Sequence, residues 1–501
     1  QCRKGQAVSR PRELLDHLEA MGVVPTGVAD DSRQVLPGDL FLAYPGDLAD
    51  GRRYIADALA RGTVAVFWQP GGNFDFGQNF PLTVGMSVEA LRQLAGPLAH
   101  AVYGHPSEGL SLIAITGTNG KTTISQCLAK AYAKPCAIIG TLGAGFPDAQ
   151  TETGFTTPEA TTLMRYLAQF RAAGAAACAL EASSIGIEEG RMNGARVDVA
   201  VFTNITRDHL DYHGTMEAYA EAKKKLFHWP RLRTAVINLD DEFGRLLSRE
   251  TTAMRILGYA IGEQRRDYPA LVRAENLVDT PFGQRFSLVL PNGRATVDTG
   301  LVGRYNISNL LAIGAVLHDA GIQPTEVARR LSELTPPPGR MERVGGNGEP
   351  LVVVDYSHTP DALENALVAL RPVADSRAGK LSVVFGCGGD RDPGKRPLMG
   401  EVAERLADRA LVTSDNPRSE QPQAIIDAIV AGMTKPEVEV DRAVAIERAI
   451  LEAGSADVVL LAGKGHENYQ EIAGIRHHFS DIEQAGAALA LRRPNNKEVA
   501  A

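Results

Sequence analysis

Short apolar runs alternate with amphipathic segments along almost the whole chain. The apolar runs are rich in Val, Ile and Leu and have the lengths of strands: 39–43, 63–68, 111–115, 198–203, 234–238, 351–355, 380–385, 409–413 and 457–462. Segments with helical spacing of apolar positions lie between many of them, for example 87–103, 122–133 and 359–370. Strands that alternate with helices in this way predict an α/β protein with mainly parallel sheets.

Two breaks divide this alternation. Residues 104–107 (Gly-His-Pro-Ser) precede an apolar run, and residues 335–339 (Thr-Pro-Pro-Pro-Gly) predict a stiff, extended linker because three prolines cannot continue a helix. A chain of 501 residues is also too long for one compact core. We therefore expect three domains, at 1–106, 107–338 and 339–501. The central one should contain a phosphate-loop-type sheet, and the last should be Rossmann-like.

Composition narrows the functional classes. The chain has 52 Lys and Arg against 60 Asp and Glu, a net charge of −8, which argues against a nucleic-acid-binding protein. No stretch approaches the ~20 apolar residues of a membrane span, so no membrane insertion is expected. The first residues lead into no apolar signal core, and the five cysteines are scattered without a CxxC pair. These features predict a cytoplasmic protein with reduced thiols.

A glycine-rich loop stands between a strand and a helix in the central region. The apolar run 113–116 is followed by Gly-Thr-Asn-Gly-Lys-Thr-Thr at 117–123. Glycines let backbone amides turn toward phosphate, and a helix N-terminus adds partial positive charge. Lys121 can then reach the outer phosphates, and the Thr122 hydroxyl can bind Mg²⁺. Ile115 stands where the strict motif has its first glycine. The motif alone fits motors, kinases, transporters and ligases equally well, and a plain glycine turn is the other interpretation.

Carboxylates, amides and histidines follow the next two strands. Glu181 ends a short apolar run, where a carboxylate is a natural Mg²⁺ ligand, although a lone Glu there is more often solvated. Residues 204–214 include His209, His213 and several acids or amides after another strand. Open α/β sheets bind ligands at such strand ends, so a site is favoured over scattered structural histidines.

Lys223 differs from the lysines beside it by its helical phase. It lies four residues after Tyr219 and four before Phe227, on the apolar face of a predicted helix. An inward ammonium is costly to bury, so it needs a partner or must lose its charge. Its neighbours Lys224 and Lys225 fit an ordinary solvated face.

Three polar segments follow strands of the last domain: 386–392, 414–418 and 463–467. Their convergence at one sheet edge would form an amino-acid site, because a planar Arg side chain can bind a carboxylate through two hydrogen bonds. A simple turn at Asn416 and Pro417, and surface charge for each Arg, are the alternatives.

Taken together, these residues resemble the Mur ligases, ATP-dependent amide-bond enzymes of peptidoglycan assembly. The matching segments follow in order and spacing over nearly the whole chain: 117–123, 181–184, 204–214, 222–223, 303–309 and 355–360. The resemblance implies ATP and Mg²⁺ as co-substrate and cofactor. It implies that the first domain binds the UDP end of the substrate, the central domain ATP, and the last domain the amino acid.

The family resemblance implies roles for the matched positions. ATP would contact Gly117, Thr118, Asn119, Gly120, Lys121, Thr122, Thr123, Asn309, Arg340 and Asp355. Thr122 and Glu181 would bind one Mg²⁺, and His209 with a carbamylated Lys223 a second. Lys121, Lys223, His209 and Glu181 would thus be the catalytic set. The UDP substrate would contact Ser32, Asp47, Leu48, Ala49, Thr156, Thr157, Ser183, Glu189 and Arg191. The chain departs from the family at Asp47 and Leu48, where His-Gln is common.

The amino-acid site implied by the resemblance contains Arg391, Asp415, Asn416, Pro417, Arg418, Gly463 and Glu467. Asp-Asn-Pro-Arg at 415–418 implies meso-diaminopimelate rather than L-lysine. ATP would phosphorylate the free D-glutamate carboxylate of UDP-N-acetylmuramoyl-L-alanyl-D-glutamate, and the diaminopimelate amine would attack the acyl phosphate. We expect a monomer with only small-molecule partners. An L-lysine-adding relative, a folylpolyglutamate synthetase-like ligase and a non-catalytic nucleotide switch remain alternatives.

Overall fold

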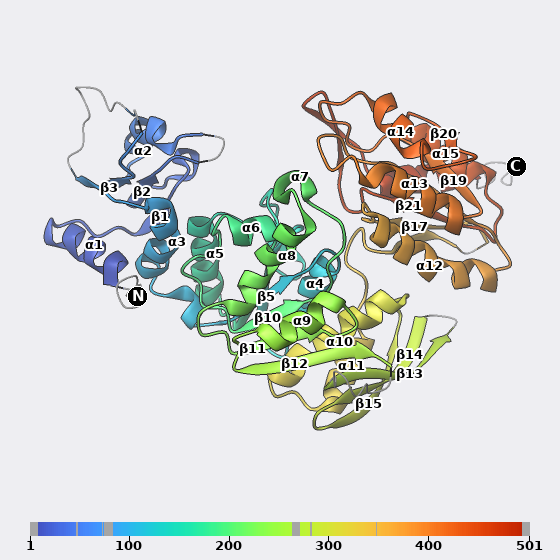
Figure 1. The fold of residues 1–501 in the computed structure, drawn as a ribbon, viewed down its shortest axis with the longest axis horizontal. Helices are drawn as coiled ribbons and strands as arrows, with labels where there is room; N and C mark the ends of the chain where they lie inside the picture. The colour runs from blue at the N-terminus through green and yellow to red at the C-terminus, as the bar shows by residue number, and fades with distance from the viewer. Residues whose placement is uncertain are drawn as a thin grey trace, which may run out of the picture.

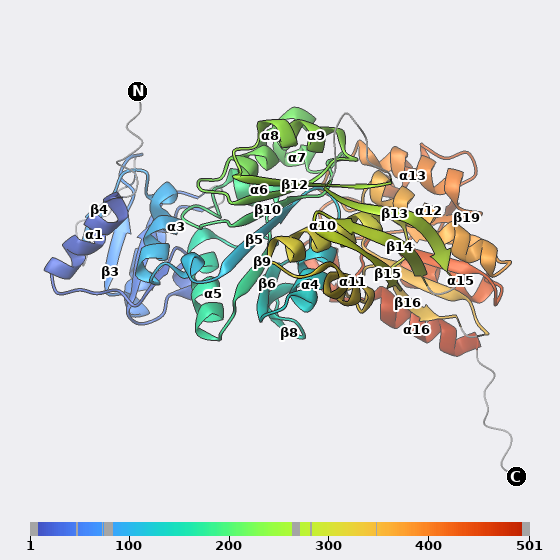
Figure 2. The same ribbon diagram turned by 90° about the horizontal axis from the view of Figure 1, so that it is seen from below.

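The computed structural model describes residues 9–46, 49–72, 74, 84–262, 271–280, 283–346 and 348–492. Three α/β domains follow one another along its long axis, from the blue end through the green and yellow centre to the orange end (Figure 1). The view turned by 90° keeps the same order (Figure 2). The predicted α/β class with three domains is confirmed. Among the described residues, no helix is long and apolar enough to span a bilayer.

The first domain contains a small parallel sheet in the order β1-β2-β3-β4. Its strands are β1 (Gly27–Ala29), β2 (Asp39–Ala43), β3 (Ala65–Trp68) and β4 (Gly85–Ser87), and its helices are α1 (Ser9–Ala20), α2 (Ile55–Ala60) and α3 (Leu91–Val102). The helix expected over 87–103 starts later, because Ser87 belongs to β4 and Ala90 has a left-handed backbone with φ 54°.

The central domain contains an 11-stranded sheet in the order β15-β14-β13-β12-β11-β10-β5-β9-β6-β7-β8. Its first strands are β5 (Ser111–Thr116), β6 (Cys136–Gly140), β7 (Gly143–Phe146), β8 (Ala149–Thr151), β9 (Ala177–Glu181) and β10 (Val199–Phe202). The others are β11 (Thr234–Asn238), β12 (Arg255–Ile261), β13 (Val272–Thr280), β14 (Gly283–Leu290) and β15 (Gly293–Thr299). The strands from β6 to β13 in this order pair in parallel, whereas both ends of the sheet are antiparallel.

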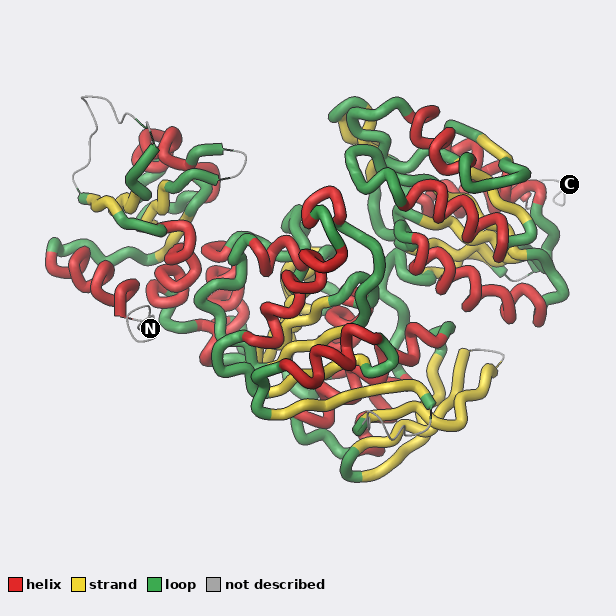
Figure 3. Tube along the Cα trace, in the orientation of Figure 1, coloured by secondary structure: helices red, strands yellow, loops and turns green. Residues whose placement is uncertain are grey.

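Helices cover the faces of the central sheet, and the strands (yellow) pass between them (Figure 3). They are α4 (Lys121–Ala131), α5 (Ala160–Ala172), α6 (Ser184–Glu188), α7 (Leu210–His213), α8 (Met216–Lys224), α9 (Glu242–Glu250), α10 (Arg304–Asp319) and α11 (Pro324–Ser332). The core on one face is formed largely by α4, α10 and α11 against the sheet, with Ile124, Leu128 and Leu311 fully buried. Burial of such side chains on both faces is typical of parallel sheets.

The last domain has a sheet in the order β16-β17-β21-β18-β19-β20. Its strands are β16 (Glu342–Gly345), β17 (Leu351–Asp355), β18 (Leu381–Phe385), β19 (Arg409–Val412), β20 (Glu437–Val438) and β21 (Val458–Ala462), and β22 (Tyr469–Ile472) pairs with β23 (Ile475–His478). The helices are α12 (Pro360–Ser376), α13 (Lys395–Leu406), α14 (Pro422–Val430), α15 (Arg442–Glu452) and α16 (Asp481–Arg492). Helix α12 continues through Pro372, beyond the expected end at residue 370.

Strand order brings the polar loops of the central domain together. β5 lies between β10 and β9, and its last residues pair with Phe202 on one side and Glu181 on the other. The loops that follow these three strands therefore leave the same edge of the sheet side by side, which is the usual ligand edge of an open α/β sheet.

Candidate active site

The phosphate loop is shaped by two glycines that no larger residue could replace. Gly117 and Gly120 have φ values of 147° and 92°. A Cβ on Gly117 would lie 1.8 Å from Thr203 Oγ1, and one on Gly120 would lie 2.5 Å from Asn309 Oδ1. The loop therefore packs directly against the β10 loop and α10, and its backbone remains free of side chains at both turns.

Lys121 begins α4 and folds back over this loop. Its Nζ donates to the carbonyl oxygens of Gly117 at 2.8 Å and Thr118 at 2.9 Å. Burial lowers the pKa of this amine, and the nearby carboxylates of Glu181 and Asp208 oppose that shift. The ammonium thus already lies over the loop on which a phosphate chain would bind, and no carboxylate of the described residues is bonded to it.

Hydroxyl groups surround Glu181, which is fully buried at the end of β9. Thr122 Oγ1 donates to Glu181 Oε2 at 3.0 Å, and Thr141 Oγ1 donates to the same oxygen at 3.0 Å. Ser125 donates to Oε1 at 3.2 Å. A buried carboxylate with neutral oxygen neighbours is a donor set that fits Mg²⁺, which prefers oxygen ligands and keeps several waters. Within the described ranges, no group of three or more His, Cys, Asp or Glu side chains could hold a metal.

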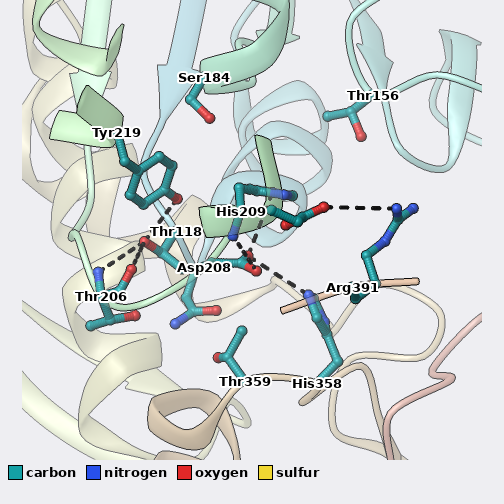
Figure 4. A network of polar contacts seen from close by, with 12 residues as sticks. Thr118, Thr156, Ser184, Thr206, Asp208, His209, Tyr219, His358, Thr359 and Arg391 are labelled. Carbon is teal, nitrogen blue, oxygen red and sulfur yellow. Dashed lines mark hydrogen bonds and ion pairs between the residues drawn. The ribbon is translucent and has the colours of Figure 1, made fainter. Parts of the chain in front are cut away.

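Asp208 lies between two histidines from different domains (Figure 4). Its Oδ2 is 3.5 Å from His209 Nε2 and 3.9 Å from His358 Nε2. Burial opposes its ionisation, but the positive charges of His209, His358, Lys395 and Lys121 together lower the Asp208 pKa to about 2. Asp208 is therefore ionised at neutral pH.

The predicted inward position of Lys223 is confirmed, because this side chain is only 1% exposed. Its Nζ lies 4.3 Å from the centre of the Tyr219 ring and makes no hydrogen bond or ion pair with any described residue. Burial, followed by the charge of Lys121, holds the Lys223 pKa well below its usual range. His209 packs against the same Tyr219, with ring centroids 6.1 Å apart.

A cavity of about 610 Å³ opens between the phosphate loop, α10 and the last domain. Six of the residues predicted for the nucleotide line it: Asn119, Gly120, Thr123, Asn309, Arg340 and Asp355. Arg340 stacks 4.4 Å from the Tyr356 ring centre and donates to Thr122 Oγ1 at 3.2 Å, while its buried Nε has no hydrogen-bond partner in the part of the chain that the structure describes. The Arg340 Nε and the open glycine turns fit an anionic group, and the remaining residues predicted for the nucleotide, Gly117, Thr118, Lys121 and Thr122, belong to the loop beside the cavity.

A second cavity, of about 680 Å³, lies between the first and central domains. Ser32, Ala49, Glu189 and Arg191, all predicted for the UDP substrate, line it. Asp47 and Leu48 lie outside the described residues.

Thr156, Thr157 and Ser183 do not line the second cavity but lie between it and Glu181. Thr157 Oγ1 donates to the Glu181 carbonyl at 2.7 Å and lies 3.1 Å from Ser183 Oγ. Thr156 Oγ1 lies 3.1 Å from Thr141 Oγ1, which in turn donates to Glu181. Arg191, which lines the second cavity, donates to the Thr157 carbonyl at 3.0 Å, so these groups connect that cavity with Glu181 beside the phosphate loop.

The amino-acid residues predicted in the last domain also converge, around a lysine that the sequence analysis missed. Lys464 is fully buried and its Nζ donates to Asn416 Oδ1 at 3.2 Å and Glu467 Oε2 at 3.3 Å. Asn416 donates in turn to Glu467 at 2.8 Å, and Asp415 lies 3.6 Å from Lys464. The sequence signal that could have indicated Lys464 is its place in the polar segment 463–467, directly after the apolar run of β21.

Arg418 and Arg391 flank this cluster. Arg418 follows Pro417 with a left-handed backbone (φ 51°), and its Nη1 donates to the Gly389 carbonyl at 2.6 Å. A Cβ on Gly388 would lie 2.9 Å from that Nη1 and 3.8 Å from Arg391 Cγ, so both arginines approach the same glycine. A Cβ on Gly463 would meet Asp415 at 2.9 Å, which explains the glycine there.

Fold and site define a three-domain α/β protein with a phosphate loop at a domain seam, and the family comparison makes the class specific. Three family models match it: "Mur ligase family, catalytic domain" over 25–103, "Mur ligase middle domain" over 115–317, and "Mur ligase, glutamate ligase domain" over 339–465. The chain belongs to the Mur ligase family.

Individual relatives agree over nearly the full length. The UDP-N-acetylmuramoyl-L-alanyl-D-glutamate--2,6-diaminopimelate ligase of Pseudomonas aeruginosa is 50% identical, with 92% of this chain and 94% of the relative covered. The protein of that name from Chromobacterium violaceum is 48% identical, with 95% and 97% covered. A solved structure of a ligase of that name is 37% identical, with a TM-score of 0.66 and 93% and 95% covered.

A more distant solved structure shares the fold. The MurF ligase from Thermotoga maritima in complex with ADP is 18% identical, with a TM-score of 0.66 and coverage of 94% of this chain and 99% of that chain. The fold is therefore shared with a protein that has little sequence in common with this chain.

Proposed function

We propose that this chain is the ATP-dependent ligase that adds meso-diaminopimelate to UDP-N-acetylmuramoyl-L-alanyl-D-glutamate in peptidoglycan synthesis. The observation that carries the proposal is the convergence of two sets of residues at one seam. The phosphate loop lies on its central side, and in the domain across it the cluster of Asp415, Asn416, Arg418 and Glu467 is flanked by Arg391, which reaches Asp211 of the central domain. Relatives named for this activity are 48–50% identical over almost the whole chain.

The reaction has two steps, in which the chain mainly positions its substrates. The D-glutamate carboxylate attacks the γ-phosphorus of ATP, which breaks the bond to ADP and forms an acyl phosphate. The diaminopimelate amine then attacks the acyl carbon, the amide bond forms, and inorganic phosphate and a proton leave. A carboxylate is a poor electrophile, so phosphate supplies the leaving group, and positioning with charge neutralisation supplies most of the catalysis.

Residues of the central domain would bind the phosphates. Lys121 and the amides of 117–123 lie over the loop, and Asn309, Arg340 and Asp355 would contact the rest of the nucleotide. Thr122 and Glu181 would hold one Mg²⁺, and His209 would contribute to a second. When bound, Mg²⁺ neutralises the phosphate charge and polarises the transferred group.

The carbamylation of Lys223 fits its surroundings. A carbamate forms when a neutral amine attacks CO₂ and releases a proton, and the lowered Lys223 pKa, caused by burial and then by the charge of Lys121, favours that neutral form. The product is an anionic oxygen ligand beside His209, which would answer the burial of an unpaired ammonium.

The other proposed roles concern the UDP substrate and the protein as a whole. The 680 Å³ cavity between the first two domains would hold the UDP end, with Ser32, Ala49, Glu189 and Arg191 in contact. The hydroxyls of Thr156, Thr157 and Ser183 would lead from it to the metal side. We propose domain boundaries at 106 and 338, a monomer, and a cytoplasmic enzyme that serves cell-wall growth, cell shape and division.

Product mass spectrometry tests the function directly. Purified protein is given ATP, Mg²⁺ and the dipeptide nucleotide, with meso-diaminopimelate and L-lysine present together. We expect the diaminopimelate tripeptide as the main product and ADP release that depends on both substrates. Preferential addition of lysine would reassign the substrate, and ATP binding without substrate-dependent ADP would indicate a nucleotide switch instead.

A further inference from the structure

A bidentate ion pair between Arg207 and Asp392 joins the central domain to the last domain. Arg207 Nε lies 2.8 Å from Asp392 Oδ2, and its Nη2 lies 3.1 Å from Oδ1. The Asp392 side chain is 8% exposed and that of Arg207 44%. Two parallel hydrogen bonds between a guanidinium and a carboxylate fix orientation as well as distance, so this contact constrains the two domains more than a single bond would.

Each partner is a sequence neighbour of a residue in the proposed active site. Arg207 precedes His209 by two residues in the loop after β10, and Asp392 directly follows Arg391 in the loop after β18. The pair therefore joins the loop on the metal side to the loop on the amino-acid side. Arg391 Nη1 also lies 4.0 Å from Asp211 in α7, the helix that directly follows the first of these loops.

The backbone around Asp392 is arranged for this contact. Asp392 Oδ1 accepts the Gly394 backbone N–H at 2.9 Å, so the same carboxylate that binds Arg207 also shapes the turn before α13. A Cβ on Gly394 would lie 2.4 Å from Arg207 Nη2. A side chain at this position would displace the guanidinium, so glycine leaves the space that the ion pair occupies.

We propose that Arg207 and Asp392 are positioning residues, whose ion pair holds the loop 386–394, and with it Arg391, against the central domain. The amine of the incoming amino acid would then meet the activated carboxylate in the right orientation. This inference rests on the proposed ligation for its kinetic consequence. Neither side chain is assigned to a substrate, because both are already paired with each other.

A double-mutant cycle tests the coupling. The variants are Arg207→Gln, Asp392→Asn and the two combined, and the measured quantities are KM for diaminopimelate and KM for the UDP substrate. We expect each single change to raise KM for diaminopimelate about three- to tenfold, and the double variant to show little more than either single one. KM for the UDP substrate should stay within about twofold, since that substrate binds at the other seam.

Arg233→Gln is the matched control, because Arg233 pairs with Asp319 at 2.7 Å, with side chains 45% and 1% exposed, inside the central domain. It should leave KM for diaminopimelate unchanged. Independent effects that multiply in the double variant, or an equal rise in the control, would overturn the positioning role.

Hydrogen exchange gives a readout that needs no activity. In Arg207→Gln without substrates, amides of 386–394 should exchange faster than in wild type, whereas Arg233→Gln should leave them unchanged. Unaltered exchange at 386–394 would refute the inference even in a fully folded variant. If wild type makes no diaminopimelate product while the exchange difference is present, the proposed function fails and the structural inference stands.

Discussion

The Asn119 side chain donates to Asp361 Oδ2 at 2.9 Å, across 242 residues of sequence. Asn119 belongs to the phosphate loop and Asp361 to the first turn of α12 in the last domain. The nucleotide cavity therefore has a wall from each domain, joined by a hydrogen bond at its rim. Arg340, which reaches Thr122 from the last domain, makes a second such connection.

Loss of that rim contact should weaken nucleotide binding. Asp361→Ala removes a charge-assisted hydrogen bond of a kind worth about 1.5–3 kcal/mol, so KM for ATP should rise by about ten- to a hundredfold. Small-angle scattering should show a larger radius of gyration for the variant without nucleotide. Asp375→Ala, on an exposed part of the same helix, is the control. If KM for ATP and the radius of gyration were both unchanged in Asp361→Ala, the contact would have no role in holding the two domains together.

Lys121 and Lys223 should both be needed, for different reasons. Lys121→Ala should lower kcat about a hundredfold or more, the usual scale for a lost charge-stabilising donor, with no chemical rescue. Lys223→Ala should lose a metal ligand, so added acetate or formate should partly restore turnover. The exposed Lys225→Ala serves as control. Wild-type turnover in Lys223→Ala without any rescue agent would contradict the ligand role.

Arg418 should distinguish diaminopimelate from lysine. Diaminopimelate carries a second carboxylate that an arginine can bind, and such a pair is worth about 1.5–3 kcal/mol. Arg418→Ala should therefore lower kcat/KM for diaminopimelate at least about tenfold and that for lysine much less. Side-by-side kinetics with both amino acids provide the measurement. Equal losses would show that Arg418 acts only by its bond to the Gly389 carbonyl.

Lys464 should set the ionisation of Glu467. Burial, then Asp415, raises the pKa of Glu467, and the Lys464 ammonium opposes that rise. Lys464→Met removes the opposing charge, so the Glu467 pKa should rise further and its carboxylate should be lost at higher pH. As the pH is lowered from 9 to 6, KM for diaminopimelate should begin to increase at a higher pH in Lys464→Met than in wild type. Lys464→Arg should restore much of the wild-type profile, and identical profiles for Lys464→Met and wild type would refute the role.

His100 should contribute to loss of stability in mild acid. Burial, followed by the charge of His105, lowers the His100 pKa to about 4, while the pKa of this histidine in the unfolded chain is about 6.5. Between these values the unfolded state binds more protons, so stability falls as pH drops from about 6.5 toward 4. The Tm of wild type should decline over that window, and His100→Gln should make the decline shallower. The exposed His477→Gln should leave the slope as in wild type, and a slope unchanged by His100→Gln would exclude His100 as a cause.

Strands that the sequence predicted most accurately are those buried on both faces. The expected limits of 39–43, 234–238 and 351–355 coincide with β2, β11 and β17, because a fully buried parallel strand is a continuous apolar run with polar residues at its ends. The ribbon β13–β15 was not predicted. Its β13 strand buries only some of its side chains in an irregular pattern with a register shift, which gives a weak period-two signal.

In the candidate site, the sequence placed residues whose position depends on their own helix or strand, and it missed a pair whose contact depends on distant parts of the chain. Helical phase alone placed Lys223 inward, and strand ends grouped Glu181 with the phosphate loop. By contrast, Arg207 and Asp392 are 185 residues apart and look like ordinary surface charges in the sequence. Their pairing depends on how two separately folded sheets face each other, which no periodicity along the chain records.

Both large cavities are walled by residues of two neighbouring domains. A molecule that fills either one binds only when those domains are folded and apposed, so its binding free energy is added to their joint stability. Heat should therefore melt the free chain in separable steps and the fully liganded chain in one. A nucleotide and a UDP substrate bound in these cavities would thus make the unfolding of the three domains more cooperative.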